Sequence, residues 1–166
     1  MSNTSFSESF QLGVHSEFQN YTGNWTGQCR VWFGPDQLAD EAEMTGTIRI
    51  ILNGRFLVHE YTASFQGKPL EGFMIMGYDL HTDRFQSAWI DTFHMNTGIL
   101  FSQGGTGKKS RPDVVGSYSS GGESPEEWGW QTDMQLQENG ELIITAYNIS
   151  PQGESVKATE TIYRRI

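Results

Sequence analysis

The chain has 166 residues, the length of one ordinary domain. Twenty acidic residues oppose 11 lysines and arginines, and the formal net charge of −9 would repel a phosphate backbone, so the composition argues against a nucleic-acid binder. Ten Phe, six Tyr and five Trp supply enough large rings to fill or line a sizeable interior.

The N-terminus carries none of the features of a targeting segment. Residues 1–11 are rich in serine and contain neither a basic region nor an apolar run long enough for export or membrane spanning. The single cysteine, Cys29, cannot form an internal disulfide, which agrees with a reducing compartment. We therefore expect a cytoplasmic protein without membrane partners, with a disordered tail over residues 1–13 and one domain over residues 14–166.

The first element in chain order is a short helix. Ser16 is a suitable N-cap for a helix over residues 17–21, and Gly23 would end it. Because this helix precedes the first strand, we expect it to act as a plug at one end of the domain.

Most of the remaining chain has the pattern of β-strands. Residues 43–52 alternate between apolar and polar side chains, and Asn53-Gly54 follows at once as a strong hairpin signal, which Asn139-Gly140 repeats later. In residues 127–138 one face carries Trp128, Trp130 and Met134. The ten predicted strands are residues 25–33, 43–52, 55–65, 70–78, 84–93, 97–103, 112–119, 127–138, 141–149 and 154–164.

Short turns between successive strands favour antiparallel neighbours, and so an up-and-down meander. An open meander would leave unpaired backbone at both edges, and closing it into a barrel removes those edges. We therefore predict an all-β fold, a single antiparallel up-and-down β-barrel of about ten strands with a short N-terminal helix. About ten strands would enclose a cavity. A sandwich of two sheets is the alternative architecture.

The motif Gly23-x-Trp25-x-Gly27 at the start and Tyr163-Arg164 at the end resemble the calycin superfamily of lipocalin-like barrels. In those barrels a tryptophan of the first strand is covered by an arginine near the chain end. The resemblance implies that Trp25 and Arg164 close the barrel, with the cation over the indole face.

A longer set of segments resembles one bacterial family of unknown function, domain-of-unknown-function family fifteen seventy-nine. The resemblance implies a calycin-like barrel and brings no established activity with it. The segments that carry it include Gly54-Arg55-Phe56, His59-Glu60-Tyr61, Gly77-Tyr78-Asp79, Ser87-Ala88-Trp89-Ile90-Asp91, Thr97-Gly98-Ile99-Leu100 and Glu160-Thr161-Ile162-Tyr163-Arg164.

The most suggestive polar residue is Asp91. Strand alternation places it on the same face as Phe85, Trp89 and Phe93, and a carboxyl group buried among rings has a raised pKa. Asp91 is therefore the candidate catalytic residue or ligand anchor. The alternative is a structural role, in which Asp91 binds backbone N–H groups or Arg164. The candidate ligand pocket is Trp25, His59, Tyr61, Met74, Met76, Tyr78, Trp89, Asp91 and Trp130.

The favoured function is an intracellular barrel that binds a small apolar ligand, with Asp91, Tyr78 or Tyr61 fixing one polar end. One alternative is an enzyme in which Asp91 transfers protons in isomerisation, cyclisation or dehydration of an apolar substrate. A haem-binding barrel is another alternative, as is a filled barrel that forms a homodimer through Trp32 and Trp128. The four histidines lack a metal-ligand spacing, so we expect no metal and no cofactor.

Overall fold

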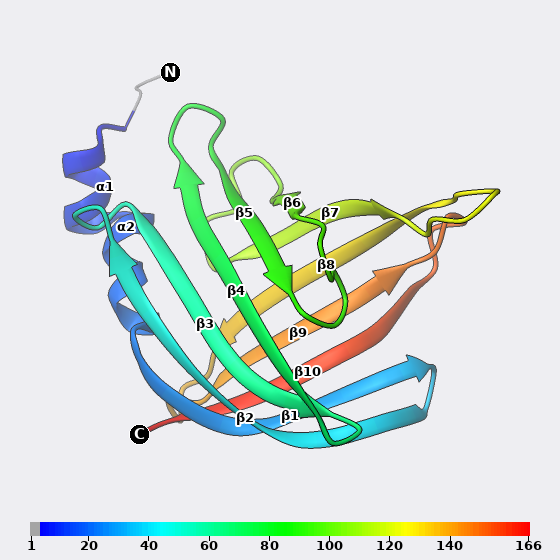
Figure 1. Ribbon diagram of the computed structural model, residues 1–166. Coiled ribbons are helices and arrows are strands. Elements are labelled where there is room, and N and C mark those ends of the chain that lie inside the picture. The colour runs from blue at the N-terminus through cyan, green and yellow to red at the C-terminus, as the bar shows by residue number, and fades with distance from the viewer. Residues whose placement is uncertain (1–3) are drawn as a thin grey trace.

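The computed structural model describes residues 4–166 and confirms the predicted closed barrel (Figure 1). Ten antiparallel strands follow one another as neighbours, and the first strand pairs with both the second and the last. The strands are β1 (Gly23–Gly34), β2 (Gln37–Ile51), β3 (Phe56–Phe65), β4 (Lys68–Asp79), β5 (Arg84–Asp91), β6 (Leu100–Gln103), β7 (Asp113–Ser119), β8 (Glu127–Leu136), β9 (Leu142–Ile149) and β10 (Ser155–Arg165).

The predicted hairpins form where the sequence indicates them. Leu52, Asn53 and Gly54 all have positive φ between β2 and β3, and Gly140 has positive φ between β8 and β9. The strand ends differ most at β2, which begins at Gln37 and not at residue 43. Strand β5 stops at Asp91 and not at residue 93, because the Asp91 side chain accepts the backbone N–H of Met95 and so supports a turn.

The N-terminus differs from the prediction of a disordered tail over residues 1–13. Helix α1 (Phe6–Leu12) begins with a capping box between Ser5 and Glu8, and α2 (Val14–Glu17) and the 3-10 helix η1 (Phe18–Tyr21) follow it. Helix α1 is fixed to the barrel by Arg55, whose guanidinium lies 4.1 Å from the ring centroid of Phe6. Residues 1–3 of the predicted tail lie outside the described residues. None of the helices within residues 4–166 is long and apolar enough to cross a membrane.

The up-and-down order gives the barrel two different ends. The turns after β2, β4, β6 and β8 lie at the same end as the chain segment before β1, where the three helices are (Figure 1). We call this the helical end. The turns after β1, β3, β5, β7 and β9 lie at the other end, which we call the open end.

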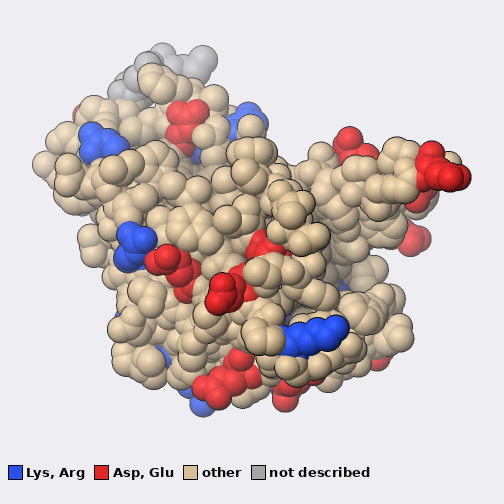
Figure 2. Space-filling view, in the orientation of Figure 1, with Lys and Arg blue, Asp and Glu red and all other residues tan. Residues whose placement is uncertain are grey.

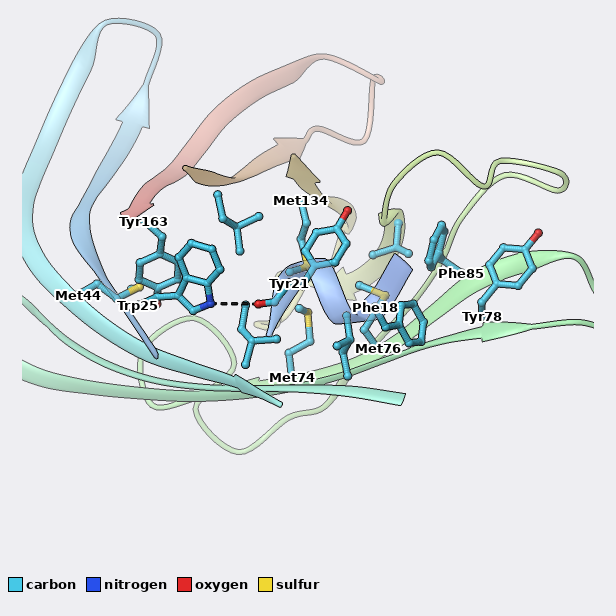
Figure 3. Packing of buried hydrophobic residues seen from close by; sticks show 14 of the residues in the cluster. Phe18, Tyr21, Trp25, Met44, Met74, Met76, Tyr78, Phe85, Met134 and Tyr163 are labelled. Atoms are coloured by element: carbon cyan, nitrogen blue, oxygen red, sulfur yellow. Dashed lines mark hydrogen bonds between the residues drawn. The ribbon is translucent and has the colours of Figure 1, made fainter. Parts of the chain in front are cut away.

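The apolar core fills the helical half of the barrel. Phe18 is 1 % exposed and enters between the strands, where it lies near Met74 and Met76 (Figure 3). Tyr21, at the end of η1, is also buried, and the backbone carbonyl of Tyr21 accepts a hydrogen bond of 3.1 Å from Nε1 of Trp25. The short helical segment before β1 therefore plugs the barrel, as the sequence predicted.

The barrel is closed by pairing of β1 with β10, but the covering cation is Arg165 and not Arg164. The Arg165 guanidinium lies 4.5 Å from the ring centroid of the fully buried Trp25, and Arg165 is the register partner of Trp25. Arg164 is paired with Thr26, and its side chain, 78 % exposed, forms an ion pair with Glu141 at 2.9 Å. Successive side chains on a strand point to opposite faces, so a shift by one residue changes the face.

The close approach of β10 explains why the second glycine of the Gly-x-Trp-x-Gly motif, Gly27, is required. A Cβ atom at this position would lie 1.8 Å from the backbone carbonyl oxygen of Ile162 on β10. The backbone of β10 cannot move away without losing its pairing with β1, so the position requires a residue without a side chain. The motif thus places a large ring and a close strand contact on the same closing strand.

We predict that Arg165→Met lowers the free energy of unfolding by about 1 to 2 kcal/mol, since it removes the cation over Trp25 and the hydrogen bond of 2.8 Å from Arg165 to the carbonyl of Asn20. Arg164→Met is the matched control and should cost less than about 0.5 kcal/mol, because its ion pair is exposed. Urea denaturation measures both, and equal losses would contradict the assignment of Arg165.

Candidate functional site

A cavity of about 430 Å³ occupies the open end of the barrel. We call it the aromatic cup, because rings from β1, the β5–β6 connection, β7 and β8 form much of its wall. These rings are Trp32, Phe33, Phe93, Tyr118, Trp128 and Trp130. In the space-filling view the surface is hollowed on the right, between the projecting arm that carries the β7–β8 turn and the lobe below it (Figure 2).

A smaller space of about 80 Å³ lies deeper in the barrel. We call it the inner chamber, and its wall includes Cys29, Met44, His59, Tyr61, Met74 and Asp91. Four residues line both the chamber and the cup, namely Val31, Trp89, His94 and Trp130. These four residues form a neck, so the two spaces adjoin along the barrel axis.

A hydrogen-bonded pair of titratable residues links the neck to the wall of the inner chamber. Asp91, at the end of β5, has a side chain only 1 % exposed, and its Oδ2 lies 2.7 Å from Nδ1 of His94. The other carboxylate oxygen accepts the backbone N–H of Met95 at 2.6 Å. His94 lies against Trp89 and Trp130, with ring centroids 5.5 and 5.1 Å away. Asp91 therefore holds the imidazole in place among the rings.

The pKa of Asp91 is lowered, whereas the sequence analysis expected it to be raised. Burial by itself raises the pKa of this carboxyl group, as expected. The hydrogen bond and the charge of His94, together with the backbone N–H groups of Met95 and His94, outweigh burial and hold the pKa below its ordinary value. Asp91 is thus a carboxylate at neutral pH. The alternative of a structural role for Asp91 is confirmed in one respect, since its carboxylate accepts a backbone N–H group. It is wrong in the other, because Arg164 bonds to Glu141 and not to Asp91.

Further hydrogen bonds fix the wall of the inner chamber. Nε1 of Trp89 donates to the hydroxyl of Tyr61 at 2.9 Å, and Nε2 of His59 lies 3.1 Å from the hydroxyl of Tyr163. The ring of Tyr61 crosses over Gly72 of β4, where a Cβ atom would lie 2.0 Å from the Tyr61 ring. These contacts hold Tyr61 and Trp89 in fixed positions beside Asp91.

The structure brings together most of the predicted pocket. Six of the nine residues line the inner chamber, namely His59, Tyr61, Met74, Trp89, Asp91 and Trp130. Trp25 and Met76 instead belong to the packed core of the helical half. Tyr78 also lies there, beside Phe85, and its hydroxyl donates to Asp83. Tyr78 is therefore not placed to fix a ligand in either space.

His94 is the site residue that the sequence reasoning missed. It lies three residues after Asp91, in the connection that leaves β5, so the strand alternation that singled out Asp91 does not reach it. The available signal was the spacing Asp-x-x-His directly after a strand end. Within residues 4–166 no three His, Cys, Asp or Glu side chains are grouped so that they could hold a metal ion.

The fold and the site define the class of the protein, a closed ten-stranded antiparallel barrel with an aromatic cavity at one end. The chain belongs to the family described as "Protein of unknown function (DUF1579)", whose model matches residues 12–165. This finding confirms the family resemblance seen in the sequence. No curated protein matches the chain.

His59 makes the stability of the protein depend on pH. Burial lowers the pKa of His59 from 6.5 to about 4, so the unfolded chain binds more protons than the folded protein between these values. The stabilising contribution is complete above pH 6.5 and is lost as the pH falls toward 4, and this difference corresponds to about 3 kcal/mol.

We predict that His59→Gln, which keeps a partner for Tyr163, weakens the loss of unfolding free energy between pH 7 and pH 4.5. Urea midpoints measured across this range provide the test. His15, whose pKa is also lowered by burial, is unchanged in the variant and so contributes equally to both proteins. Parallel pH profiles for the two proteins would show that His59 is not buried in its neutral form.

Proposed function

We propose that this protein binds a small, largely apolar molecule in the aromatic cup at the open end of the barrel. The observation that carries the proposal is the contrast between the two ends. Helices and core side chains fill the helical half, while the open half keeps a cavity of about 430 Å³ that adjoins the inner chamber.

The size and the lining of the cup support this proposal. Ligand sites are concave, about 300 to 1,000 Å³, and mostly apolar, with a few polar groups that set orientation. The cup combines aromatic walls with His94 at the neck and with a hydrogen bond of 2.7 Å between Tyr118 and Asn148 on its wall. Its rings are supported by each other, since Trp89 and Trp130 stack with centroids 5.4 Å apart.

The cup fits haem poorly. Haem carries two carboxylate groups, whereas Lys157 is the only lysine or arginine of residues 4–166 that lines the cup, and it is already paired with Glu160 at 2.6 Å. Nε2 of His59, the other imidazole that lines the inner chamber, lies within hydrogen-bond distance of Tyr163. We therefore assign no role to haem.

The structure does not support the alternative of an enzyme that uses Asp91 for proton transfer. It required a carboxyl group with a raised pKa, and the pKa of Asp91 is lowered. Trp32 and Trp128, the candidate residues for a homodimer interface, both line the cup, so ligand contact accounts for them without a second subunit. The homodimer stays a prediction, which size-exclusion chromatography with light scattering would check.

We predict that the neutral dye N-phenyl-1-naphthylamine binds to the protein with a rise in fluorescence, and that Ala158→Phe weakens this binding at least tenfold. Ala158 is buried in the wall of the cup beside Trp130, so a phenylalanine there would fill the space that the dye needs. Fluorescence titration gives both affinities, and native mass spectrometry of gently purified protein searches for a retained natural ligand.

Ala88→Phe is the matched control for this substitution. Ala88 lies on β5 between Phe85 and Asp91 in sequence but on the opposite face from them, paired with Ile75 and with the 69 % exposed Phe101. It should leave dye binding unchanged. If Ala158→Phe binds the dye as tightly as the unaltered protein, the cup is not the binding site.

A further inference from the structure

The position of the proton on His94 follows from its partner. Asp91 is ionised at neutral pH, and a carboxylate can only accept hydrogen bonds. The short contact of 2.7 Å between Asp91 Oδ2 and His94 Nδ1 therefore requires Nδ1 to carry a hydrogen. In the neutral imidazole the other nitrogen, Nε2, then has a free lone pair and acts as an acceptor.

Nε2 of His94 is open to the cavity. Within residues 4–166 no fully buried side-chain nitrogen or oxygen lacks a hydrogen-bond partner, and Nε2 has no partner among those residues. It must therefore be accessible, and His94 lines both the cup and the inner chamber. The neck thus presents one hydrogen-bond acceptor of fixed orientation to whatever occupies the cup.

The surroundings of Nε2 restrict the charge and shape of its partner. A carboxylate or phosphate would be repelled by the negative charge of Asp91. Lys157, the one lysine or arginine among the described residues that lines the cup, is already paired with Glu160. Rings stand close on several sides of the imidazole, with Phe93 at 4.5 Å and Trp130 at 5.1 Å between centroids. Aromatic rings pack well against other rings in offset or edge-to-face geometry.

We propose that the cup selects neutral aromatic compounds that carry a hydroxyl group, whose O–H donates to Nε2 of His94 while the ring system packs against Phe93 and Trp130. This inference rests on the proposed function, since it names the ligand class of the same cavity. In this arrangement Asp91 is a positioning residue. It fixes the tautomer of His94 and does not touch the ligand.

The test compares two probes with the same ring system, 2-naphthol and 2-methoxynaphthalene. In the second probe a methyl group replaces the hydroxyl hydrogen, so it cannot donate a hydrogen bond. Equilibrium dialysis at pH 8 should show that 2-naphthol binds about fivefold more tightly, the gain expected for one net hydrogen bond. Equal affinities would overturn the role of His94 but leave the cup as a binding site. Failure of both probes to bind would overturn this inference and the proposed function together.

Asp91→Asn provides a second and independent readout. The backbone N–H of Met95 should keep the amide oxygen in the place of Oδ1, so the amide NH2 group would face Nδ1 of His94. The ring proton would then move to Nε2, which becomes a donor. We expect the preference for 2-naphthol to disappear while 2-methoxynaphthalene still binds, and long-range proton–nitrogen NMR correlations should show the change of tautomer.

Asp133→Asn is the control for this substitution. Asp133 is a half-buried aspartate that pairs with Arg111 and does not line the cup or the chamber. It should keep the fivefold preference. If Asp91→Asn also keeps the preference, or if NMR places the His94 proton on Nε2 in the unaltered protein, the proposed recognition is wrong.

Discussion

The arrangement of the whole barrel depends on how Trp25 is held at the helical end. Its indole N–H binds the carbonyl of Tyr21, its ring packs against Tyr163 with centroids 6.1 Å apart, and Arg165 covers it. These contacts join the helical segment, the first strand and the last strand at one point. They therefore close the sheet and seat the plug in the same end.

Sealing one end leaves the other end free for a ligand. Phe18, Met76, Phe85 and Met134 pack in the helical half, so the cavity is confined to the open half, where β1, β8 and β10 contribute its walls. Small residues keep this space open. Ala158 and Ala146 are both buried beside Trp130, and a larger side chain would occupy the cup at Ala158 and the inner chamber at Ala146. The division between core and cavity thus follows from which end carries the helices.

Strand alternation and turn signals were sufficient to predict ten strands, the closed barrel and the buried position of Asp91, because each depends on local pattern. Arg165 was missed because β10 carries two adjacent arginines, and only the register with β1 decides which one faces Trp25. Helix α1 was missed because it is only seven residues long, and the contacts that hold Phe6 and Phe10 come from Arg55 and Gly54 on the barrel. The lowered pKa of Asp91 depends on His94, which lies in a connection without a periodic pattern.

The most direct measurement of the central claim is the set of intermolecular nuclear Overhauser effects between bound N-phenyl-1-naphthylamine and methyl-labelled protein. The account predicts contacts from the dye to the methyl groups of Ala158 and Met95, which line the cup. It predicts none to Met76 and Met134, which belong to the core of the helical half. Contacts to Met76 and Met134, or to outward-facing residues such as Ala88 alone, would contradict a ligand site at the open end.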